Sequence, residues 1–124
     1  MGYKVLIVED SEASRDYLST AVASFDGAEV VATDRGFEAL KLLPLHRFDL
    51  IITDIQMPDI NGLELINFVK KNPNYRHTPL FIVTAEGREK DRERGLALGA
   101  SEYLVKPVKL EDLIGLLRRY LQEP

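Results

Sequence analysis

The sequence contains no cysteine and only two histidines. Without thiols, disulfide bonds, thiol catalysis and thiolate metal sites are excluded, and the composition is compatible with a reducing cytosol. His46 and His77 lie in polar connecting segments and lack the paired spacing that a histidine metal site needs, so we interpret both as solvated loop residues. A metal site in this chain would therefore have to be built from oxygen ligands.

An excess of positive charge and long apolar runs are missing as well. Sixteen Lys and Arg against twenty Asp and Glu give a formal net charge of −4, which disfavours direct binding to nucleic acid. No run approaches the length of a transmembrane helix, and the first residues lead into a predicted strand, not into the apolar region of a signal peptide. We expect a soluble cytoplasmic protein that does not contact a membrane and forms one domain over residues 1–124.

Short apolar runs alternate with helical patterns along the chain. We predict strands at residues 4–8, 29–33, 50–53, 79–84 and 102–105, with a helix after each, and we interpret the runs at 4–8 and 50–53 as buried strands. Five strands alternating with five helices, joined by short connections, predict an α/β fold with a doubly wound parallel sheet and helices on both faces. The apolar residues at helical spacing are Tyr17, Leu18, Ala21, Val22 and Phe25, then Phe37, Leu40 and Leu43, with Pro44 ending that helix, then Leu63, Ile66 and Val69, then Leu96, Ala97 and Leu98, and finally Leu110, Leu113, Ile114, Leu117 and Leu121.

Polar residues follow the predicted strands at the points where the strands end. Glu9 and Asp10 follow the first strand, Asp54 follows the third, Thr84 ends the fourth and Lys106 follows the fifth. Parallel strands joined by right-handed crossovers present their carboxyl ends at one rim of the sheet, where ligands bind in such folds. A single aspartate after a strand is more often a turn or helix cap. Five such residues on one rim favour a functional site.

The chemistry of these five residues suits a phosphoryl group and a hard metal ion. Three carboxylates without thiol or imidazole are typical ligands of Mg²⁺ or Mn²⁺, and crowded carboxylates need a cation to offset their repulsion. Lys106 offers a positive charge and Thr84 a hydroxyl donor for phosphoryl oxygens. Asp54 would be the nucleophile, because aspartate carboxylates form covalent acyl phosphates.

Over essentially its whole length, the chain resembles the receiver domain of two-component response regulators (CheY-like). The resemblance is carried by the acidic pair Glu9-Asp10, by Asp54-Ile-Gln-Met-Pro-Asp-Ile-Asn-Gly62, by Thr84-Ala85 and by Lys106-Pro107. It implies a five-stranded sheet of flavodoxin-like strand order 2-1-3-4-5. All five core positions match the family pattern, and Glu9 in place of a second Asp is an ordinary variation.

The resemblance also implies a reaction and a set of roles. Asp54 would accept a phosphoryl group from the phosphohistidine of a sensor histidine kinase or phosphotransfer protein. Asp10, Asp54 and the main-chain carbonyl of Gln56 would hold Mg²⁺, with Glu9 acting mostly through water. Lys106 would contact the acyl phosphate and precede a cis bond to Pro107. Such a domain catalyses its own phosphorylation and dephosphorylation and is not otherwise an enzyme.

By the same resemblance, phosphorylation would switch a surface. Thr84 would move onto the phosphoryl group while Tyr103 turns inward, and Gln56 and Glu86 would tune how long the acyl phosphate lasts. An edge-strand Tyr103 with its hydroxyl in water is an equal alternative. The output face would comprise the almost wholly charged helix over residues 86–98, which we expect to be weakly anchored, with the last strand and last helix. This face would control a downstream protein or output domain, and phosphorylation-dependent dimerisation stays open.

Three other functions can be weighed against this one. A haloacid-dehalogenase-type phosphatase needs a second acid two residues after the nucleophile, where this chain has Gln56. A flavin-binding flavodoxin-like protein needs a hydroxyl- and glycine-rich phosphate loop after the first strand, where Glu9 and Asp10 would repel phosphate. A protein-interaction module that uses the receiver fold without phosphorylation stays open. The sequence also leaves open whether the receiver stands alone or was part of a longer protein.

Overall fold

A computed structural model describes residues 2–122, which form a five-stranded sheet, five α-helices and one 3-10 helix. Within these residues, no helix combines the length and the apolar character that crossing a bilayer requires. The elements in chain order are β1 (Tyr3–Val8), α1 (Glu12–Ala23), β2 (Ala28–Thr33), α2 (Gly36–Leu42), η1 (Leu43–Leu45), β3 (Leu50–Thr53), α3 (Gly62–Lys71), β4 (Leu80–Thr84), α4 (Glu89–Leu98), β5 (Glu102–Val105) and α5 (Leu110–Leu121).

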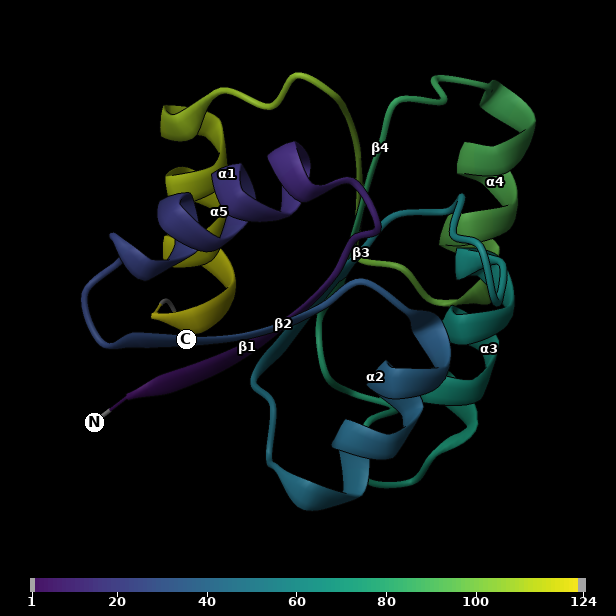
Figure 1. The fold of residues 1–124 in the computed structure, drawn as a ribbon, viewed down its shortest axis with the longest axis horizontal. Coiled ribbons are helices and arrows are strands. Elements are labelled where there is room, and N and C mark those ends of the chain that lie inside the picture. The colour runs from purple at the N-terminus through teal and green to yellow at the C-terminus, as the bar shows by residue number, and fades with distance from the viewer. Residues whose placement is uncertain (1, 123–124) are drawn as a thin grey trace.

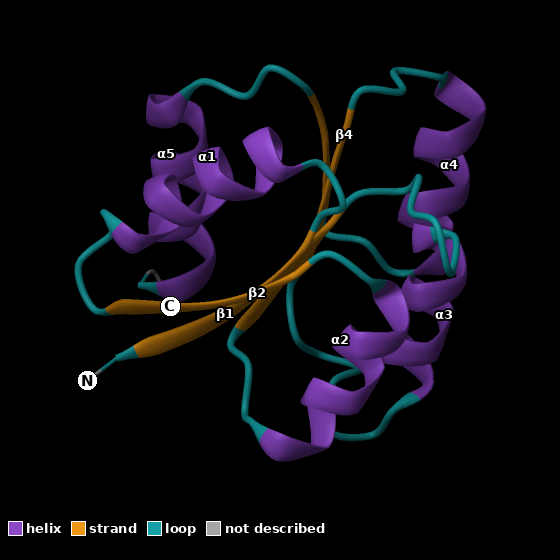
Figure 2. Cartoon of the chain, viewed as in Figure 1, coloured by secondary structure: helices purple, strands orange, loops and turns teal. Residues whose placement is uncertain are grey.

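The five strands are parallel and lie in the order β2-β1-β3-β4-β5. Helices α1 and α5 cover one face of the sheet, and α2, α3 and α4 cover the other (Figure 1). Figure 2 shows the strands as a twisted central layer between these two helical layers. This arrangement confirms the predicted doubly wound α/β fold and its strand order.

Alternation along the strands divides the core into two layers. In β1, Val5 and Ile7 belong to the cluster under α1 and α5, whereas Leu6 and Val8 belong to the cluster under α2, α3 and α4. Successive side chains of a strand point to opposite faces, so a strand that is apolar throughout is buried on both sides. Such burial rigidly holds the rim at which the strands end.

The second helical segment differs from its prediction. Of its predicted apolar residues, Leu43 is buried and Leu40 half-buried, but Phe37 is 53% exposed, and Ala39 is buried in its place. Helix α2 ends at Leu42, but the chain continues through the 3-10 helix η1, so Pro44 does not stop the helical path. Proline fits near the start of a helix because the N–H that it lacks has no intrahelical partner there.

Other differences concern helix starts and surface positions. Helix α1 begins at Glu12 rather than near Ser14, because the Ser11 hydroxyl accepts a hydrogen bond from the Ser14 amide at 3.3 Å and caps the helix. Helix α4 begins at Glu89, three residues later than predicted. Helical spacing was thus a good guide to the existence of each helix and a poorer one to its ends. Besides Phe37, three of the predicted apolar-face residues lie exposed: Tyr17, Ala97 and Leu110.

Candidate functional site

Main-chain hydrogen bonds extend the sheet by one residue at the rim. The Glu9 amide donates to the Thr33 carbonyl at 3.0 Å, and the Asp54 amide donates to the Val8 carbonyl at 3.1 Å. The backbones of Glu9 and Asp54 are therefore fixed by the sheet and not by flexible loops. A site built on strand ends is held more precisely than one built on loops.

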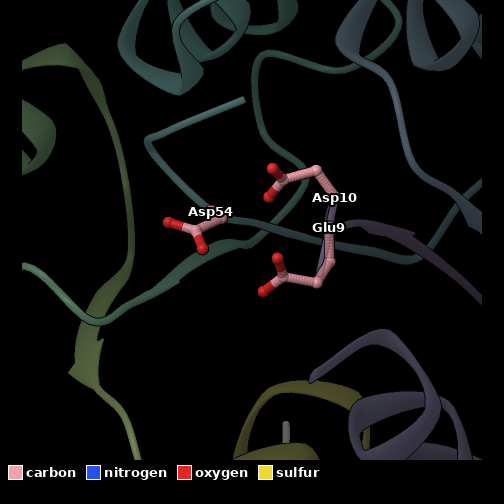
Figure 3. Close-up of side chains that lie close together, drawn as sticks. All are labelled: Glu9, Asp10 and Asp54. Atoms are coloured by element: carbon pink, nitrogen blue, oxygen red, sulfur yellow. The ribbon is translucent and has the colours of Figure 1, made fainter. Parts of the chain in front are cut away.

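Three carboxylates gather at this rim. Glu9, Asp10 and Asp54 each offer an oxygen within 4.8 Å of the others. Figure 3 shows the side chains of Glu9 and Asp10 extending from the end of β1 toward the side on which the Asp54 carboxylate lies. Glu9 and Asp54 are 1% and 7% exposed, whereas Asp10 is open to solvent. Clustered anionic oxygens that solvent can reach on one side form a donor set that fits a hard divalent cation.

Lys106 lies between two of the carboxylates. Its ammonium nitrogen donates to Glu9 Oε1 at 2.5 Å and to Asp54 Oδ2 at 2.9 Å. Burial lowers the pKa of Lys106, but these hydrogen bonds and charges outweigh burial, and the net shift is upward. The backbone of Lys106 is fixed because its amide donates to the Thr84 carbonyl at 2.8 Å. Lys106 is therefore a protonated cation directed at the rim.

Burial dominates the ionisation of Glu9. Desolvation raises the pKa of its carboxyl, and the hydrogen bonds from the Lys106 ammonium and the Ser11 amide offset this only in part. A buried carboxylate beside a second carboxylate favours any added positive charge. Glu9 thus makes the rim attractive to a cation even though Lys106 already contacts it.

The Asp54 carboxylate is oriented from both sides. Its Oδ1 accepts the amide of Ile55 at 2.6 Å and, more weakly, the amide of Gln56 at 3.4 Å, while Oδ2 accepts Lys106. The start of α3 closes over the same residue, since a Cβ on Gly62 would lie 2.1 Å from the Asp54 carbonyl oxygen. Only glycine lets the helix approach this closely. A fixed, partly neutralised carboxylate at the end of a strand is suited to nucleophilic attack on an anionic group.

The remaining predicted residues lie around the loop between β4 and α4. Thr84 is buried and its hydroxyl accepts the Glu86 amide at 3.3 Å. Tyr103 is half-buried and its hydroxyl donates to the Glu86 carbonyl, so the hydroxyl is not free in water as one alternative expected. The side chain of Gln56 donates to Glu86 Oε1 at 3.4 Å, so the two expected tuning positions touch each other. The bond between Lys106 and Pro107 is cis, as expected.

Two residues near the rim escaped sequence reasoning. Arg15 donates to the carbonyls of Glu9 and Asp10 at 3.0 and 3.4 Å, and so ties α1 to the acidic pair. Asp59 accepts main-chain amides of Gly36 and Phe37 at 3.0 and 2.8 Å. An arginine one turn into a helix and an aspartate in a loop carry no distinctive signal, because their partners become neighbours only in the folded chain.

An apolar cavity of about 500 Å³ opens beside Lys106, between α1 and the loop that follows β5. Tyr17 lines it, and its hydroxyl donates to the Val108 carbonyl across the cavity at 2.6 Å. A concave, mostly apolar surface of this kind is a common place for a ligand or partner to bind. Other lining residues are Ala13, Leu18, Val83 and Pro107.

The sequence pattern of the response regulator receiver domain matches residues 5–118 of this chain. The chain belongs to this family. A similar relative is the polar-differentiation response regulator DivK of Brucella anthropi, with 36% identity over 121 residues that cover 98% of each chain. As a receiver domain, the protein has the role of a response regulator receiver in two-component signalling.

Solved receiver structures superpose closely on this one. Chemotaxis protein CheY4 of Vibrio cholerae, at 36% identity, gives a TM-score of 0.90 over 98% of this chain and all of its own. The receiver domain of a Pseudomonas aeruginosa sensor histidine kinase, at 28% identity, gives 0.89 over 99% of this chain and 100% of its own, and that structure has magnesium coordinated in its active-site cleft. The acidic cluster of this receiver domain is consistent with divalent metal binding.

Proposed function

We propose that this receiver domain is a phosphorylation-operated switch in which Asp54 accepts a phosphoryl group from phosphohistidine. One observation carries the proposal: the Asp54 carboxylate is 7% exposed, lies within 4.8 Å of two other carboxylates and accepts a hydrogen bond from Lys106 at 2.9 Å. The groups that would serve as nucleophile, metal ligands and charge-neutralising cation thus lie together at one rim of the sheet, after β1, β3 and β5. The unit that works in this way is the domain over residues 1–124.

Phosphoryl transfer at this site needs few protein groups. A carboxylate oxygen of Asp54 attacks phosphorus, the new P–O bond forms as the P–N bond to the imidazole breaks, and the imidazole nitrogen keeps the electron pair. Lys106 neutralises charge on the oxygens of the transferring group, and Thr84 supplies a hydroxyl to one of them in the phosphorylated state. The domain would then hydrolyse its own acyl phosphate, as receiver domains do. We propose no other enzymatic activity for this chain.

Mg²⁺ fits the donor set, with Mn²⁺ as the alternative. Asp10, Asp54 and the main-chain carbonyl of Gln56 would hold the ion, and Glu9 would act through water. A divalent cation here offsets the negative charge that accumulates when an anionic phosphoryl group approaches three carboxylates.

The proposed phosphoryl transfer and the surface features near the rim indicate two kinds of partner. Receiver domains interact with histidine kinases and with downstream partners. We propose that a histidine kinase or phosphotransfer protein docks at the apolar cavity beside Lys106, and that α4, β5 and α5 form the face that a downstream protein or output domain reads. The short hydrogen bond from Tyr103 to the Glu86 carbonyl links this face to the loop after Thr84. Phosphorylation would shift an existing equilibrium between two surface conformations.

The test is the intact mass of the protein after incubation with acetyl phosphate, with and without Mg²⁺. We expect the parent to gain one phosphoryl group only when Mg²⁺ is present, and Asp54→Asn to gain none while keeping the parent circular dichroism spectrum. The matched control is Asp49→Asn, which changes the same residue type at the opposite end of β3 and should label like the parent. Labelling of Asp54→Asn would show that the nucleophile lies elsewhere. No labelling of a parent that binds Mg²⁺ would favour the unphosphorylated interaction module.

A further inference from the structure

Asp59 joins two segments that are far apart in the sequence. It lies in the loop between β3 and α3, and its carboxylate accepts the amides of Gly36 and Phe37, the first two residues of α2, across 23 and 22 residues. Amides in the first turn of a helix have no partner within the helix, and a capping side chain normally comes from the residue just before it. Here that residue is Arg35, whose side chain makes no such bond. We call the two hydrogen bonds from Gly36 and Phe37 the Asp59 bridge.

Close packing supports the same junction. A Cβ on Gly36 would lie 1.9 Å from Ile60 Cγ2 and 3.4 Å from Met57 Cε, so the backbone of α2 rests directly on the loop. Ile60 is buried, and its amide also donates to Asp59 Oδ1 at 2.9 Å. Partial burial raises the pKa of Asp59, but the amide hydrogen bonds outweigh burial and the net shift is downward. The bridging group is therefore a carboxylate that accepts hydrogen bonds at both oxygens.

The bridge holds the part of the loop that other contacts hold weakly. Ile55 holds both ends of the loop. At the start of the loop its amide donates to Asp54 Oδ1 at 2.6 Å, and its carbonyl accepts the amide of Gly62, where the loop ends, at 2.6 Å. Between these ends, Gln56 and Pro58 are exposed, and the Gln56 side chain makes a long hydrogen bond of 3.4 Å to Glu86. The Gln56 amide contacts Asp54 Oδ1 only at a long 3.4 Å, so the position of the Gln56 carbonyl depends mainly on what anchors the residues that follow it.

We propose that Asp59 is a positioning residue for the phosphoacceptor site: through the Asp59 bridge it holds the loop on α2, so that the Gln56 carbonyl stands beside Asp54 before a metal ion binds. This inference rests on the proposed function, because the Gln56 carbonyl needs positioning only if the rim binds Mg²⁺. A loop that is ordered in advance loses less conformational freedom on binding and therefore binds more tightly. Residues that orient metal ligands without touching the metal have such effects in other sites.

The experiment is a titration of the full unphosphorylated chain with MgCl₂, followed by the amide NMR shifts of the rim residues. We expect Asp59→Ala to weaken Mg²⁺ binding about tenfold, the lower end of what loss of a ligand-orienting residue costs. Asp59→Asn keeps one acceptor oxygen and should have a dissociation constant between those of Asp59→Ala and the parent. At saturating Mg²⁺, both variants should label with acetyl phosphate to the parent's extent.

Asp49→Ala is the matched control. Asp49 also accepts a distant main-chain amide, that of Lys4 at 2.8 Å, but at the end of β3 away from the rim. We expect this variant to lose stability to urea and to keep the parent's Mg²⁺ affinity. An unchanged affinity in Asp59→Ala, or an equal loss in Asp49→Ala, would overturn the inference while leaving the proposed function intact. Absence of Mg²⁺-dependent shifts in the parent would instead overturn both. If Asp59→Ala does not fold, the comparison of Asp59→Asn with the parent decides.

Discussion

Lys106 is the residue on which the electrostatics of the rim depend. It is the cation between Glu9 and Asp54, and its side chain is largely buried, at 20% exposure. Removing one partner of a buried ion pair lowers the free energy of unfolding by more than the pair itself contributes, because the other charge stays buried without compensation. Lys106 therefore stabilises the fold itself, apart from its proposed contact with a phosphoryl group.

We expect Lys106→Met to lower the free energy of unfolding by about 2 kcal/mol at neutral pH, a value below that for fully buried pairs because Lys106 is partly solvated. The raised pKa of Glu9 should rise further without its cation. A carboxyl whose pKa is raised in the folded state penalises folding fully above the raised pKa, and the penalty fades as the pH falls from that pKa to the ordinary one, so the loss should shrink toward acidic pH. Urea unfolding of parent and variant at several pH values measures this dependence.

The control for this variant is Lys109→Met, an exposed lysine on the same loop. It should change stability little at any pH. Lys106→Met should still bind Mg²⁺, since the carboxylates remain. Acetyl phosphate, however, should no longer produce the change on the face formed by α4, β5 and α5 that we expect in the parent. A destabilisation that is independent of pH would show that the packing of the Lys106 side chain, and not its charge, is what matters.

Helix α3 begins directly against the backbone of Asp54, the proposed phosphoacceptor. Its first residue, Gly62, leaves no room for a Cβ, which would lie 2.1 Å from the Asp54 carbonyl oxygen and 2.7 Å from Ile55 Cα. Both obstacles are backbone atoms, so relief requires the helix or the strand end to move. The orientation of Asp54 thus depends on the start of α3 as much as on the end of β3.

We expect Gly62→Ala to destabilise the receiver domain by roughly 2 to 3 kcal/mol, as overpacking against rigid neighbours does, and to slow acetyl phosphate labelling. Gly115→Ala is the matched control, because Gly115 lies exposed within α5 with no atom in reach of an added Cβ. That variant should stabilise the protein by about 1 kcal/mol through helix propensity. Urea denaturation and labelling rates measure both effects, and destabilisation of similar size in the two variants would contradict the steric argument.

Helix α4 is the least anchored of the helices that cover its face. It is as long as α3, at 10 residues, yet only Gly95 is buried in it, whereas α3 buries Gly62, Leu63, Leu65, Ile66 and Val69. Packing rather than propensity supplies most of the stability of a helix. The run of charged residues correctly predicts this weak anchoring, although the helix begins three residues later than its predicted start.

For the molecule as a whole, the difference in packing between α3 and α4 predicts which elements change when the proposed phosphorylation occurs. We expect the amides of α4 to exchange with solvent faster than those of α3 in the unphosphorylated protein, because weakly packed elements open at lower cost. With acetyl phosphate and Mg²⁺, the largest changes in exchange should fall on α4 and β5 and not on α1. Hydrogen–deuterium exchange read by mass spectrometry provides both comparisons, with Asp54→Asn as the control. Equal protection of α3 and α4 would contradict the expected route of the signal.

Local pattern was sufficient for most of the fold and for the main site residues. Apolar runs between turn residues become strands of a covered sheet, so β3 and β5 lie at the predicted residues, although only β3 is buried throughout and the edge strand β5 has no buried residue. Parallel strands share a rim, so the positions of Glu9, Asp54 and Lys106 follow from their places after strands. The exposure of Phe37 could not be inferred in this way, because a short helix can present its apolar residues at more than one rotation.

Contacts between distant segments were decided by the tertiary structure alone. The hydrogen bond of Lys106 with Asp54, the Asp59 bridge and the bond from Tyr103 to the Glu86 carbonyl each join residues that no spacing rule relates. The chain's periodicity determines which face of each element is apolar, whereas the distances between side chains depend on how the elements twist and pack together. The sequence thus specifies the chemistry available at the rim, and the packing of five strands and their helices specifies which groups meet.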